Sequence, residues 1–371
     1  MKKVLFIFGT RPEAVKLCPV IWHMRRRSEE FAARVCVTAQ HRELLDQVLE
    51  PFEVKPDHDL HVMTPGQTLF QTTSRIVTGL QPVLESESPD MVVVQGDTTT
   101  TFCGALASFY SGIPVAHVEA GLRTGDIYQP FPEEMNRLLT TRLSGLHLAA
   151  TEWAAGNLRR EGIPDTSIAV TGNTGIDAVL HVKQELESGR LAGPDWPWLD
   201  PGRKLLVVTA HRRENFGEGI ANICAALATL AGRSDVQIAY AVHPNPNVTE
   251  PVRKYLGSFG NIFLLEPQGY VPFVDLMRRA HILITDSGGI QEEGPSLGKP
   301  ILVLRNKTER PEAVQAGTVQ LVGTNPNRIV EAATALLDDH GKWAAMARVH
   351  NPYGDGQASQ RIAARILRFR R

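Results

Sequence analysis

Short runs of apolar, mostly β-branched residues recur along the chain and alternate with segments that have the apolar spacing of helices. Continuous apolar runs are typical of strands covered on both faces, as in a parallel sheet between layers of helices. The expected strands fall into two groups: Val4–Phe8, Val35–Thr38, Met91–Gln95, Val115–Val118 and Leu146–Ala149, then Leu205–Thr209, Ile238–Val242, Ile262–Leu265, Ile282–Thr285 and Ile301–Leu304. We therefore expect an α/β fold with two Rossmann-like, doubly wound domains.

The stretch SGRLAGPDWPWLDPGR (188–203) is rich in Gly and Pro and lies between the two groups of strands. We place an N-terminal domain at 1–180, a linker at 181–203 and a C-terminal domain at 204–352. The last segment, 353–371, ends in an amphipathic basic helix. Its apolar residues are too few for a membrane-surface helix, which favours packing on the N-terminal domain.

The class of protein can be limited further from the length of the chain, its composition and its net charge. A chain of 371 residues is long enough for two domains, and its hydrophobic fraction of 43% allows real cores. The net charge of −1 gives no indication of nucleic acid or an acidic membrane as partner. Four cysteines without a CxxC pair fit reduced thiols, and the apolar run after Lys2-Lys3 is too short for a signal peptide. We expect a cytoplasmic protein without membrane insertion.

Unusual polar residues follow the expected strands. Open parallel sheets bind ligands at the carboxyl ends of their strands. The residues at these ends are Gly9-Thr10-Arg11, Gly96-Asp97-Thr98, Glu119-Ala120-Gly121, His211-Arg212-Arg213-Glu214, His243-Pro244 and Asp286-Ser287-Gly288-Gly289. Two sheets that turn these edges toward each other would enclose a cleft suited to a ligand with a diphosphate and many hydroxyls.

Three carboxylates, Asp97, Glu119 and Glu133, are the main candidates for proton transfer. Pro132 directly before Glu133 is typical of a helix start, which would bring Glu133 close to the strand end that carries Glu119. Neighbouring carboxylates can serve as an acid and a base at the same pH.

Each candidate also has a purely structural explanation. Asp97 and Ser287 could belong to helix N-caps, and Glu133 could complement a helix dipole. His211 and His243 could be satisfied by backbone groups. No HExxH or paired histidine spacing predicts a metal site, and no GxxxxGK[ST] or GxGxxG predicts a P-loop or a nicotinamide cofactor. We expect no cofactor and no metal.

Several longer motifs identify a family. They are GTRPEAVK (9–16), AQHRELLDQV (39–48), GDTTTT (96–101), HVEAGLRTGD (117–126), PFPEEMNR (130–137), GNTGIDA (172–178), TAHRREN (209–215), HPNP (243–246), TDSGGIQEE (285–293), TERPEAV (308–314) and NPYGDG (351–356). In this order they resemble the bacterial non-hydrolysing UDP-N-acetylglucosamine 2-epimerases. The resemblance implies a glycosyltransferase-B-like fold, a UDP-sugar cleft, a homodimer, and reversible epimerisation of UDP-GlcNAc to UDP-ManNAc for cell-envelope polysaccharide.

The resemblance also implies a mechanism, in which UDP is eliminated to give 2-acetamidoglucal and then added back. It implies the following residue roles: Asp97, Glu119, Glu133 and His211 as catalytic residues; Arg11, Lys16 and Arg137 as cationic contacts; Ser287, Gly288 and Gly289 for the diphosphate; Glu293 for the ribose; Gln268 and Phe273 for the uracil; and Arg310 as a further contact in the cleft. Which carboxylate acts on which face of the sugar stays open.

Some features depart from the family pattern or leave alternatives. Gly269 and Asn306 stand where acidic residues are usual. Some members are activated by a second substrate molecule, and the residues compatible with such a site here are Gln40, His41, Arg212 and His243. Glu43 and Gly66, however, replace residues expected in strongly regulated members. The alternatives are a glycosyltransferase of the same fold, a hydrolysing epimerase that releases ManNAc and UDP, and an inactive UDP-sugar-binding protein.

Overall fold

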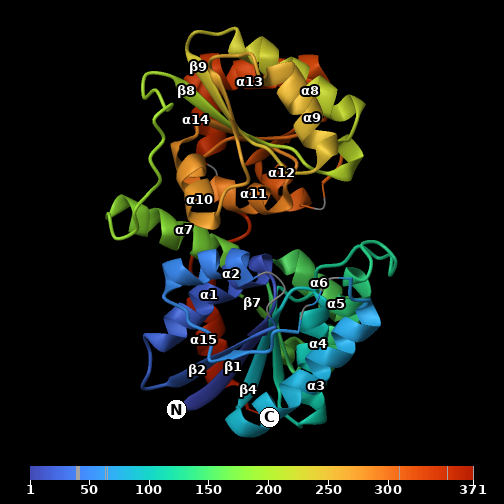
Figure 1. Cartoon of the computed structure of the whole chain (residues 1–371). Helices are drawn as coiled ribbons and strands as arrows, with labels where there is room; N and C mark the ends of the chain where they lie inside the picture. Colours follow the sequence, from blue (N-terminus) through green and yellow to red (C-terminus); the bar gives the residue numbers. More distant parts are fainter. Residues whose placement is uncertain (39–41, 63, 65, 309, 349, 371) are drawn as a thin grey trace. The chain divides into compact units, whose positions relative to one another are not determined.

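The computed structural model describes residues 1–38, 42–62, 64, 66–308, 310–348 and 350–370, without the side chains of 42–44. The chain forms two compact units (Figure 1). Unit 1 comprises Met1–Ala178 and Gly354–Arg371, and unit 2 comprises Val179–Tyr353.

The centre of unit 1 is a parallel sheet with the strand order β3-β2-β1-β4-β5-β6-β7. Its strands are β1 (Lys2–Phe8), β2 (Phe31–Val37), β3 (His58–Asp59), β4 (Met91–Gln95), β5 (Val115–Val118), β6 (Leu146–Ala149) and β7 (Ile168–Val170). Every residue of β4, β5 and β6 is buried, as expected for strands covered on both faces. The strand order reverses between β1 and β4, which is where ligands bind in doubly wound sheets.

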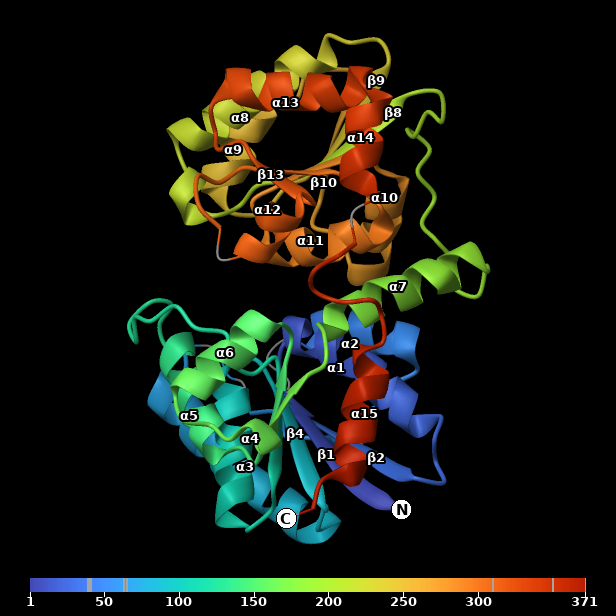
Figure 2. The same ribbon diagram turned by 180° about the vertical axis from the view of Figure 1, so that it is seen from behind.

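Helices cover both faces of this sheet (Figure 2). They are α1 (Arg11–Arg25), α2 (Arg42–Leu49), α3 (Leu69–Glu87), α4 (Thr99–Tyr110), α5 (Glu133–Leu143), α6 (Glu152–Arg160) and α15 (Ala358–Arg368). Helix α7 (Thr174–Glu187) begins in unit 1 and passes into unit 2 at Val179. Helix α1 packs against α2 and α15, whereas α4 packs against α3 and α5. The C-terminal helix α15 buries Ile362 and Ile366, and Lys2 Nζ donates to the carbonyl of Ile366 at 2.7 Å. The last helix of the chain is therefore part of the core of unit 1.

Unit 2 repeats the plan with a parallel sheet in the order β10-β9-β8-β11-β12-β13. Its strands are β8 (Lys204–Thr209), β9 (Val236–Ala241), β10 (Ile262–Leu265), β11 (Ile282–Thr285), β12 (Ile301–Val303) and β13 (Val319–Leu321). Its helices are α8 (Glu218–Ala231), α9 (Pro246–Leu256), α10 (Tyr270–Arg279), α11 (Gly288–Glu293), α12 (Pro311–Ala316), α13 (Pro326–Asp338) and α14 (His340–Ala347). The reversal of strand order lies between β8 and β11, the counterpart of β1 and β4.

All the strands expected from apolar runs are present, and the two doubly wound domains are confirmed. The strands that the apolar pattern misses are β3, β7 and β13, each at the edge of a sheet. They are two or three residues long and only partly buried. A strand of two or three residues is too short to give the run of four or five residues by which the other strands are predicted.

The segment predicted as a linker, 181–203, begins inside α7, and the stretch after that helix has neither helix nor strand. This stretch is nevertheless attached to unit 2. The Trp196 indole donates to Asp275 Oδ2 at 2.7 Å, and the Trp198 ring stacks on Phe263 with centroids 4.6 Å apart. Residues 196–198 therefore form part of the surface of unit 2.

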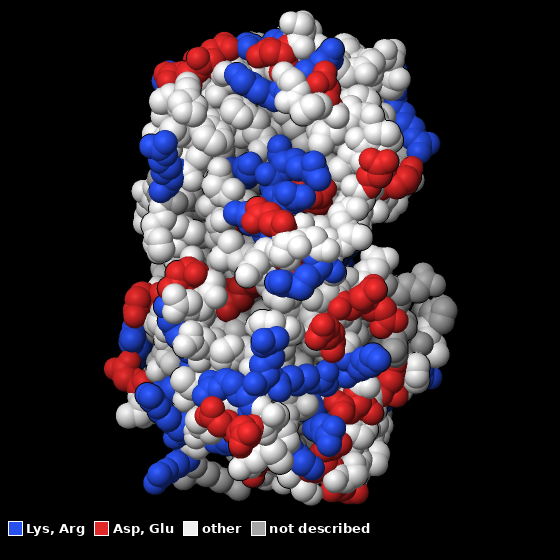
Figure 3. Space-filling model, turned by 90° about the vertical axis from the view of Figure 1, so that its left-hand side faces the viewer, with Lys and Arg blue, Asp and Glu red and all other residues white. Residues whose placement is uncertain are grey.

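The surface carries both signs of charge. Acidic and basic side chains are interspersed on each unit in the face that Figure 3 shows. Among the described residues, no helix is both long enough and apolar enough to cross a membrane. The cysteines at 18, 36, 103 and 224 are all buried as free thiols.

Two histidines lie side by side inside the sheet of unit 1. His117 on β5 pairs in register with His147 on β6, and the side chains are 1% and 2% exposed. Burial lowers the pKa of His117 to about 3 and the pKa of His147 to about 4. Both rings are therefore neutral in the folded protein at physiological pH.

These lowered pKa values predict acid sensitivity. Their stabilising contribution is complete above about pH 6.5, because the histidines are then neutral in both states. Below that pH only the unfolded chain takes up the protons, so each histidine should cost about 2 kcal/mol between pH 7 and pH 5. The variant His147→Gln should reduce the pH-dependent loss in unfolding free energy by about that amount, measured by urea unfolding at both pH values.

The matched control is His350→Gln, at an exposed position, which should leave the difference between the two pH values unchanged. An equal loss in His147→Gln and in the unmodified protein would contradict the burial argument.

Candidate active site

Most of the predicted site residues lie in loops at the carboxyl ends of the central strands. In unit 1 these loops follow β1, β4 and β5, and in unit 2 they follow β8, β9 and β11. A parallel sheet brings all its carboxyl ends to one edge, so residues far apart in sequence meet there.

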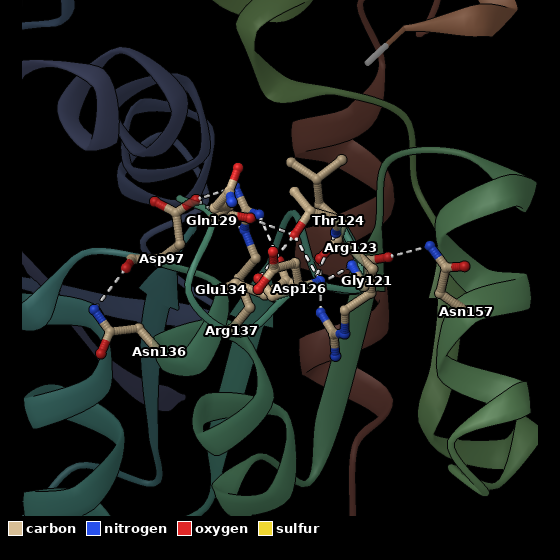
Figure 4. Close-up of polar contacts among 12 residues, drawn as sticks. Asp97, Gly121, Arg123, Thr124, Asp126, Gln129, Glu134, Asn136, Arg137 and Asn157 are labelled. Atoms are coloured by element: carbon tan, nitrogen blue, oxygen red, sulfur yellow. Dashed lines mark hydrogen bonds and ion pairs between the residues drawn. The ribbon is translucent and has the colours of Figure 1, made fainter. Parts of the chain in front are cut away.

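Asp97 follows β4 and is held by an arginine (Figure 4). Its Oδ2 accepts hydrogen bonds from Nε of Arg137 at 2.9 Å and from Nη2 at 2.6 Å, while Nη1 of Arg137 donates to Glu134 Oε2 at 2.8 Å. Burial disfavours the charged guanidinium, but Asp97 and Glu134 outweigh this effect and raise the pKa of Arg137. Arg137, predicted as a contact for the ligand, thus fixes the orientation of Asp97.

Glu134 is an important residue that the motif analysis did not select. It is 1% exposed, and its Oε1 accepts from the backbone N–H groups of Thr124 at 3.0 Å and Gly125 at 3.2 Å. Asn136, two residues later, donates to the backbone carbonyl of Asp97 at 2.9 Å. Helix α5 therefore positions both Asp97 and the glycine turn. The i, i+3 spacing of Glu134 and Arg137 is the sequence feature from which an ion pair between them could have been predicted.

Glu119 follows β5 in an unusual backbone conformation, with φ of 63°. A residue with a side chain rarely adopts the left-handed region, and such strain is concentrated at functional sites. Its carboxylate forms an ion pair with Lys16 of α1 and accepts from Gln95 Nε2 at 2.5 Å. A Cβ added to Gly96 would lie 3.8 Å from Glu119 Oε2, so this carboxylate lies beside the residue that precedes Asp97.

Glu133 is the first residue of α5, directly after Pro132. Its Oε2 is buried and has no hydrogen-bond partner among the residues that the structure describes. A buried carboxylate oxygen without a partner costs free energy, which makes this atom a candidate for contact with a bound ligand. The loops after β4 and β5 and the first turn of α5 thus carry the three predicted carboxylates within unit 1.

In unit 2, a buried aspartate organises the loop after β8. Asp286 is 0% exposed, and its Oδ2 accepts from the backbone N–H groups of His211 and Arg212, both at 2.8 Å, and from Asn215 Nδ2 at 3.0 Å. Its Oδ1 lies 3.3 Å from Nδ1 of His211. The His211 ring stacks on His243 with centroids 5.5 Å apart.

These neighbours set the charge of His211. Burial lowers its pKa, and His243 and Arg212 add to that shift, while Asp286 opposes it. His211 is therefore mainly neutral at pH 7. Asp286 was not among the predicted site residues, because its role depends on a loop 75 residues earlier in the chain.

The glycines at 288 and 289 begin helix α11, which also carries two adjacent glutamates. Glu292 is 7% exposed and accepts from Arg310 Nε at 2.7 Å. A Cβ on Gly288 would lie 2.5 Å from Cζ of Arg310, whereas one on Gly289 would lie 3.8 Å from Glu293 Oε1. The guanidinium of Arg310 is thus packed on the backbone of Gly288, and it compensates the charge of Glu292.

The remaining predicted residues that the structure describes lie in α10, in the loop before it and at the start of α1. Gln268 donates to the carbonyl of Glu266 at 2.7 Å, and Phe273 lies in α10. Arg11 is the first residue of α1. Gln40 and His41 lie outside the described residues. Within the described part of the chain, no group of three or more His, Cys, Asp or Glu side chains is placed to hold a metal ion.

Comparison with known proteins agrees with the motifs. The family model described as UDP-N-acetylglucosamine 2-epimerase matches residues 23–367. The chain is 56% identical over 365 residues to the UDP-N-acetylglucosamine 2-epimerase of Escherichia coli K12, covering 97% of each chain. It is 54% identical over 374 residues to a probable UDP-N-acetylglucosamine 2-epimerase of Ralstonia nicotianae, covering 100% of each.

A solved structure extends the likeness to three dimensions. The crystal structure of the Neisseria meningitidis UDP-GlcNAc 2-epimerase bound to UDP-GlcNAc superposes with a TM-score of 0.89 at 49% identity, over 99% of this chain and 100% of that one. The expected glycosyltransferase-B-like fold class is therefore confirmed. The chain belongs to the UDP-N-acetylglucosamine 2-epimerase family.

Proposed function

We propose that the protein interconverts UDP-GlcNAc and UDP-ManNAc by inverting C2 of the sugar, and that the product supplies cell-envelope polysaccharide. The observation that carries the proposal is the grouping of Asp97, Glu119 and Glu133 around the loops at the carboxyl edge of unit 1, in a chain 56% identical to a named epimerase. Two of these carboxylates are paired with cations, Glu119 with Lys16 and Asp97 with Arg137.

The chemistry requires both an acid and a base. The proton at C2 is not next to a carbonyl, so enolisation cannot invert this centre. A base instead removes the C2 proton while the bond between C1 and the UDP oxygen breaks, and the leaving diphosphate keeps the electron pair. UDP then adds back to 2-acetamidoglucal as an acid delivers a proton to the opposite face of C2. We assign these proton transfers to Asp97, Glu119 and Glu133.

We assign binding of the nucleotide to unit 2. Gly288 and Gly289 offer backbone N–H groups to the diphosphate, and Ser287 offers its hydroxyl, since its own N–H donates to the Thr285 hydroxyl at 2.9 Å. Arg310 and neutral His211 lie in loops of the same sheet edge. The remaining roles are Glu293 for the ribose hydroxyls, Gln268 and Phe273 for the uracil, and Arg11 and Lys16 as further cationic contacts. A second nucleotide-sugar molecule as an activator would involve Arg212 and His243, together with Gln40 and His41.

A labelling experiment separates the alternatives. UDP-GlcNAc incubated with the protein in D2O, without an acceptor, should gain deuterium at C2 and form UDP-ManNAc. A glycosyltransferase would give no exchange, and a hydrolysing epimerase would release free ManNAc and UDP.

The variant Glu119→Gln tests the assignment of the acid and base. It keeps the size of the side chain but removes the charge, so UDP binding should persist while C2 exchange falls by about 10²–10⁴. The matched control is Glu152→Gln, an exposed glutamate on α6, which should retain full exchange. Retention of more than about a tenth of the exchange rate in Glu119→Gln would remove Glu119 from the mechanism.

A pair of glycine variants tests the diphosphate assignment. A methyl group at Gly288 must displace the Arg310 guanidinium, whereas one at Gly289 makes an ordinary contact. Calorimetric titration should therefore show UDP bound about tenfold more weakly by Gly288→Ala, a loss of about 1.4 kcal/mol. Gly289→Ala should lose less. The reverse order of the two affinities would contradict the role of Arg310.

We also propose a cytoplasmic homodimer. The four buried free thiols fit a reducing compartment. A groove of about 680 Å³ between α3 and α4 offers an interface. Apolar residues such as Leu84 and Tyr110 line it together with polar ones such as Gln81 and Glu85, and Tyr110 is 71% exposed. Phe109, next to Tyr110, is 60% exposed, and neighbouring exposed apolar side chains are typical of protein–protein contacts.

A charge in the α3–α4 groove should separate the subunits. Sedimentation should show a dimer for the unmodified protein and a monomer for Tyr110→Asp, because the substitution replaces exposed apolar surface with a charge that the interface would have to bury. Tyr255→Asp, at a tyrosine 45% exposed on α9, should remain dimeric. A monomeric unmodified protein, or a dimeric Tyr110→Asp, would contradict the assignment.

A further inference from the structure

Glu13 is a buried carboxyl group at the carboxyl edge of the unit 1 sheet. It is 1% exposed. Its Oε2 accepts from the backbone N–H groups of Gly9 at 3.0 Å and Thr10 at 2.7 Å, and from the Thr10 hydroxyl at 2.7 Å. Its Oε1 lies 2.7 Å from the Thr98 hydroxyl and 3.0 Å from the Thr101 hydroxyl. Both oxygens are therefore fully engaged inside the protein.

Glu13 forms more hydrogen bonds than the capping of α1 requires. The bonds to Thr10 form a capping box at the start of α1. The bonds to Thr98 and Thr101 instead reach the start of α4, 85 and 88 residues away. Glu13 thus joins the loop after β1 to the loop after β4, at the point where the strand order reverses.

Residues of the proposed mechanism lie on both sides of this connection. Thr98 directly follows Asp97 and is the N-cap of α4. Lys16 lies on α1 three residues after Glu13 and pairs with Glu119. A shift of Glu13 would therefore move the backbone that carries Asp97 relative to the cation that holds Glu119.

If Glu13 were ionised, one of its contacts would have no proton, the one with the Thr101 hydroxyl. The Thr101 hydroxyl has one proton, and its shortest contact, 2.5 Å, is with the carbonyl oxygen of Gln95, which can only accept. The 3.0 Å contact between Thr101 Oγ1 and Glu13 Oε1 then has a proton only if Glu13 supplies it. A carboxylic acid that donates to Thr101 while accepting from Thr98 satisfies both contacts of Oε1. Only the longer contact between the Thr98 and Thr101 hydroxyls, 3.1 Å, is then without a proton.

The surroundings agree with this proton count. All the donors to Glu13 named above are neutral groups, and a buried ionised carboxylate normally requires a cation. Burial raises the pKa of Glu13, and the hydrogen bonds from Thr10, Thr98 and Gly9 oppose the shift only in part.

We propose that Glu13 is a positioning residue, held as a neutral carboxylic acid, that locks the loop after β1 to the start of α4 and so sets the relative orientation of Asp97 and the Lys16–Glu119 pair. The proposal rests on the roles assigned above to Asp97 and Glu119. A neutral acid provides the hydrogen bonds without adding a negative charge beside the reacting carboxylates. It therefore competes neither for Lys16 nor with the diphosphate of the ligand.

Infrared spectroscopy tests the protonation state directly. The protein labelled with 13C at the glutamate side-chain carboxyl should show, at neutral pH, the carbonyl stretch of a protonated glutamic acid, and Glu13→Gln should lack it. The label separates glutamate from aspartate bands, including any from the buried Asp177. An identical spectrum in Glu13→Gln would overturn the proposal, whether or not the carboxylates of the mechanism are correctly assigned.

Kinetics tests the positioning role. Gln retains an acceptor and a donor, so Glu13→Gln should keep kcat within about threefold, whereas Glu13→Ala should lower kcat about tenfold or more with little change in KM. Rescue by Gln but not by Ala is the expected result. Equal loss of kcat in both variants would contradict a neutral acid, and full activity in both would contradict a positioning role. Glu13→Gln alone decides the first point if Glu13→Ala does not fold.

Asp177 provides the matched control. Its carboxyl group is also buried in unit 1, where it accepts from the backbone N–H groups of Ala358 and Ser359 at the start of α15. Asp177→Asn should lower thermal stability and leave kcat unchanged. A loss of kcat as large as in Glu13→Ala would mean that any buried cap in unit 1 has the same effect, which would overturn the specific role of Glu13.

Discussion

Backbone N–H groups at the carboxyl ends of the strands must find partners outside the sheet, and a buried carboxyl group receives them in both units. In unit 1, Glu13 accepts from the loop after β1 and joins it to the start of α4. In unit 2, Asp286 extends from the end of β11 and accepts from the loop after β8. Each contact crosses the point where the strand order reverses. The loops that carry the chemistry are therefore ordered by the same hydrogen bonds that satisfy the backbone.

Charge compensation governs the remaining side chains. The acidic residues at the sheet edges lie beside basic partners: Asp97 and Glu134 share Arg137, Glu119 pairs with Lys16, and Glu292 pairs with Arg310. The pair of Glu292 and Arg310 explains how two adjacent glutamates can follow a glycine turn suited to an anion. Arg310 compensates the negative charge of Glu292, and the carboxylate of Glu293 lies beside Gly289. The buried Oε2 of Glu133 contrasts with them, since it has no partner within the described residues.

The sequence predicts the central strands and the loops at their ends, because a buried strand leaves a local signal in consecutive apolar residues. Very short strands such as β7 leave a weaker signal, since three residues are too few to form a distinct apolar run. The pattern also locates Asp97, Glu119 and the Ser287–Gly289 turn. It does not predict that Glu134 and Asp286 hold the neighbouring loops in place, because the hydrogen bonds by which they do so form only after folding. The proton on Glu13 depends on a geometry of hydroxyls that no linear pattern contains.

The helix at the end of the chain has a consequence for biosynthesis. Unit 1 is built from the first 178 residues together with the last 18 (354–371), so unit 2 can complete its own sheet on the ribosome while unit 1 still lacks α15. During that interval the apolar surface of α1 that α15 covers is open to water and to other chains. Newly made protein is thus open to association with other chains until α15 packs on α1, and a variant without Ala358–Arg368 would keep that apolar surface exposed.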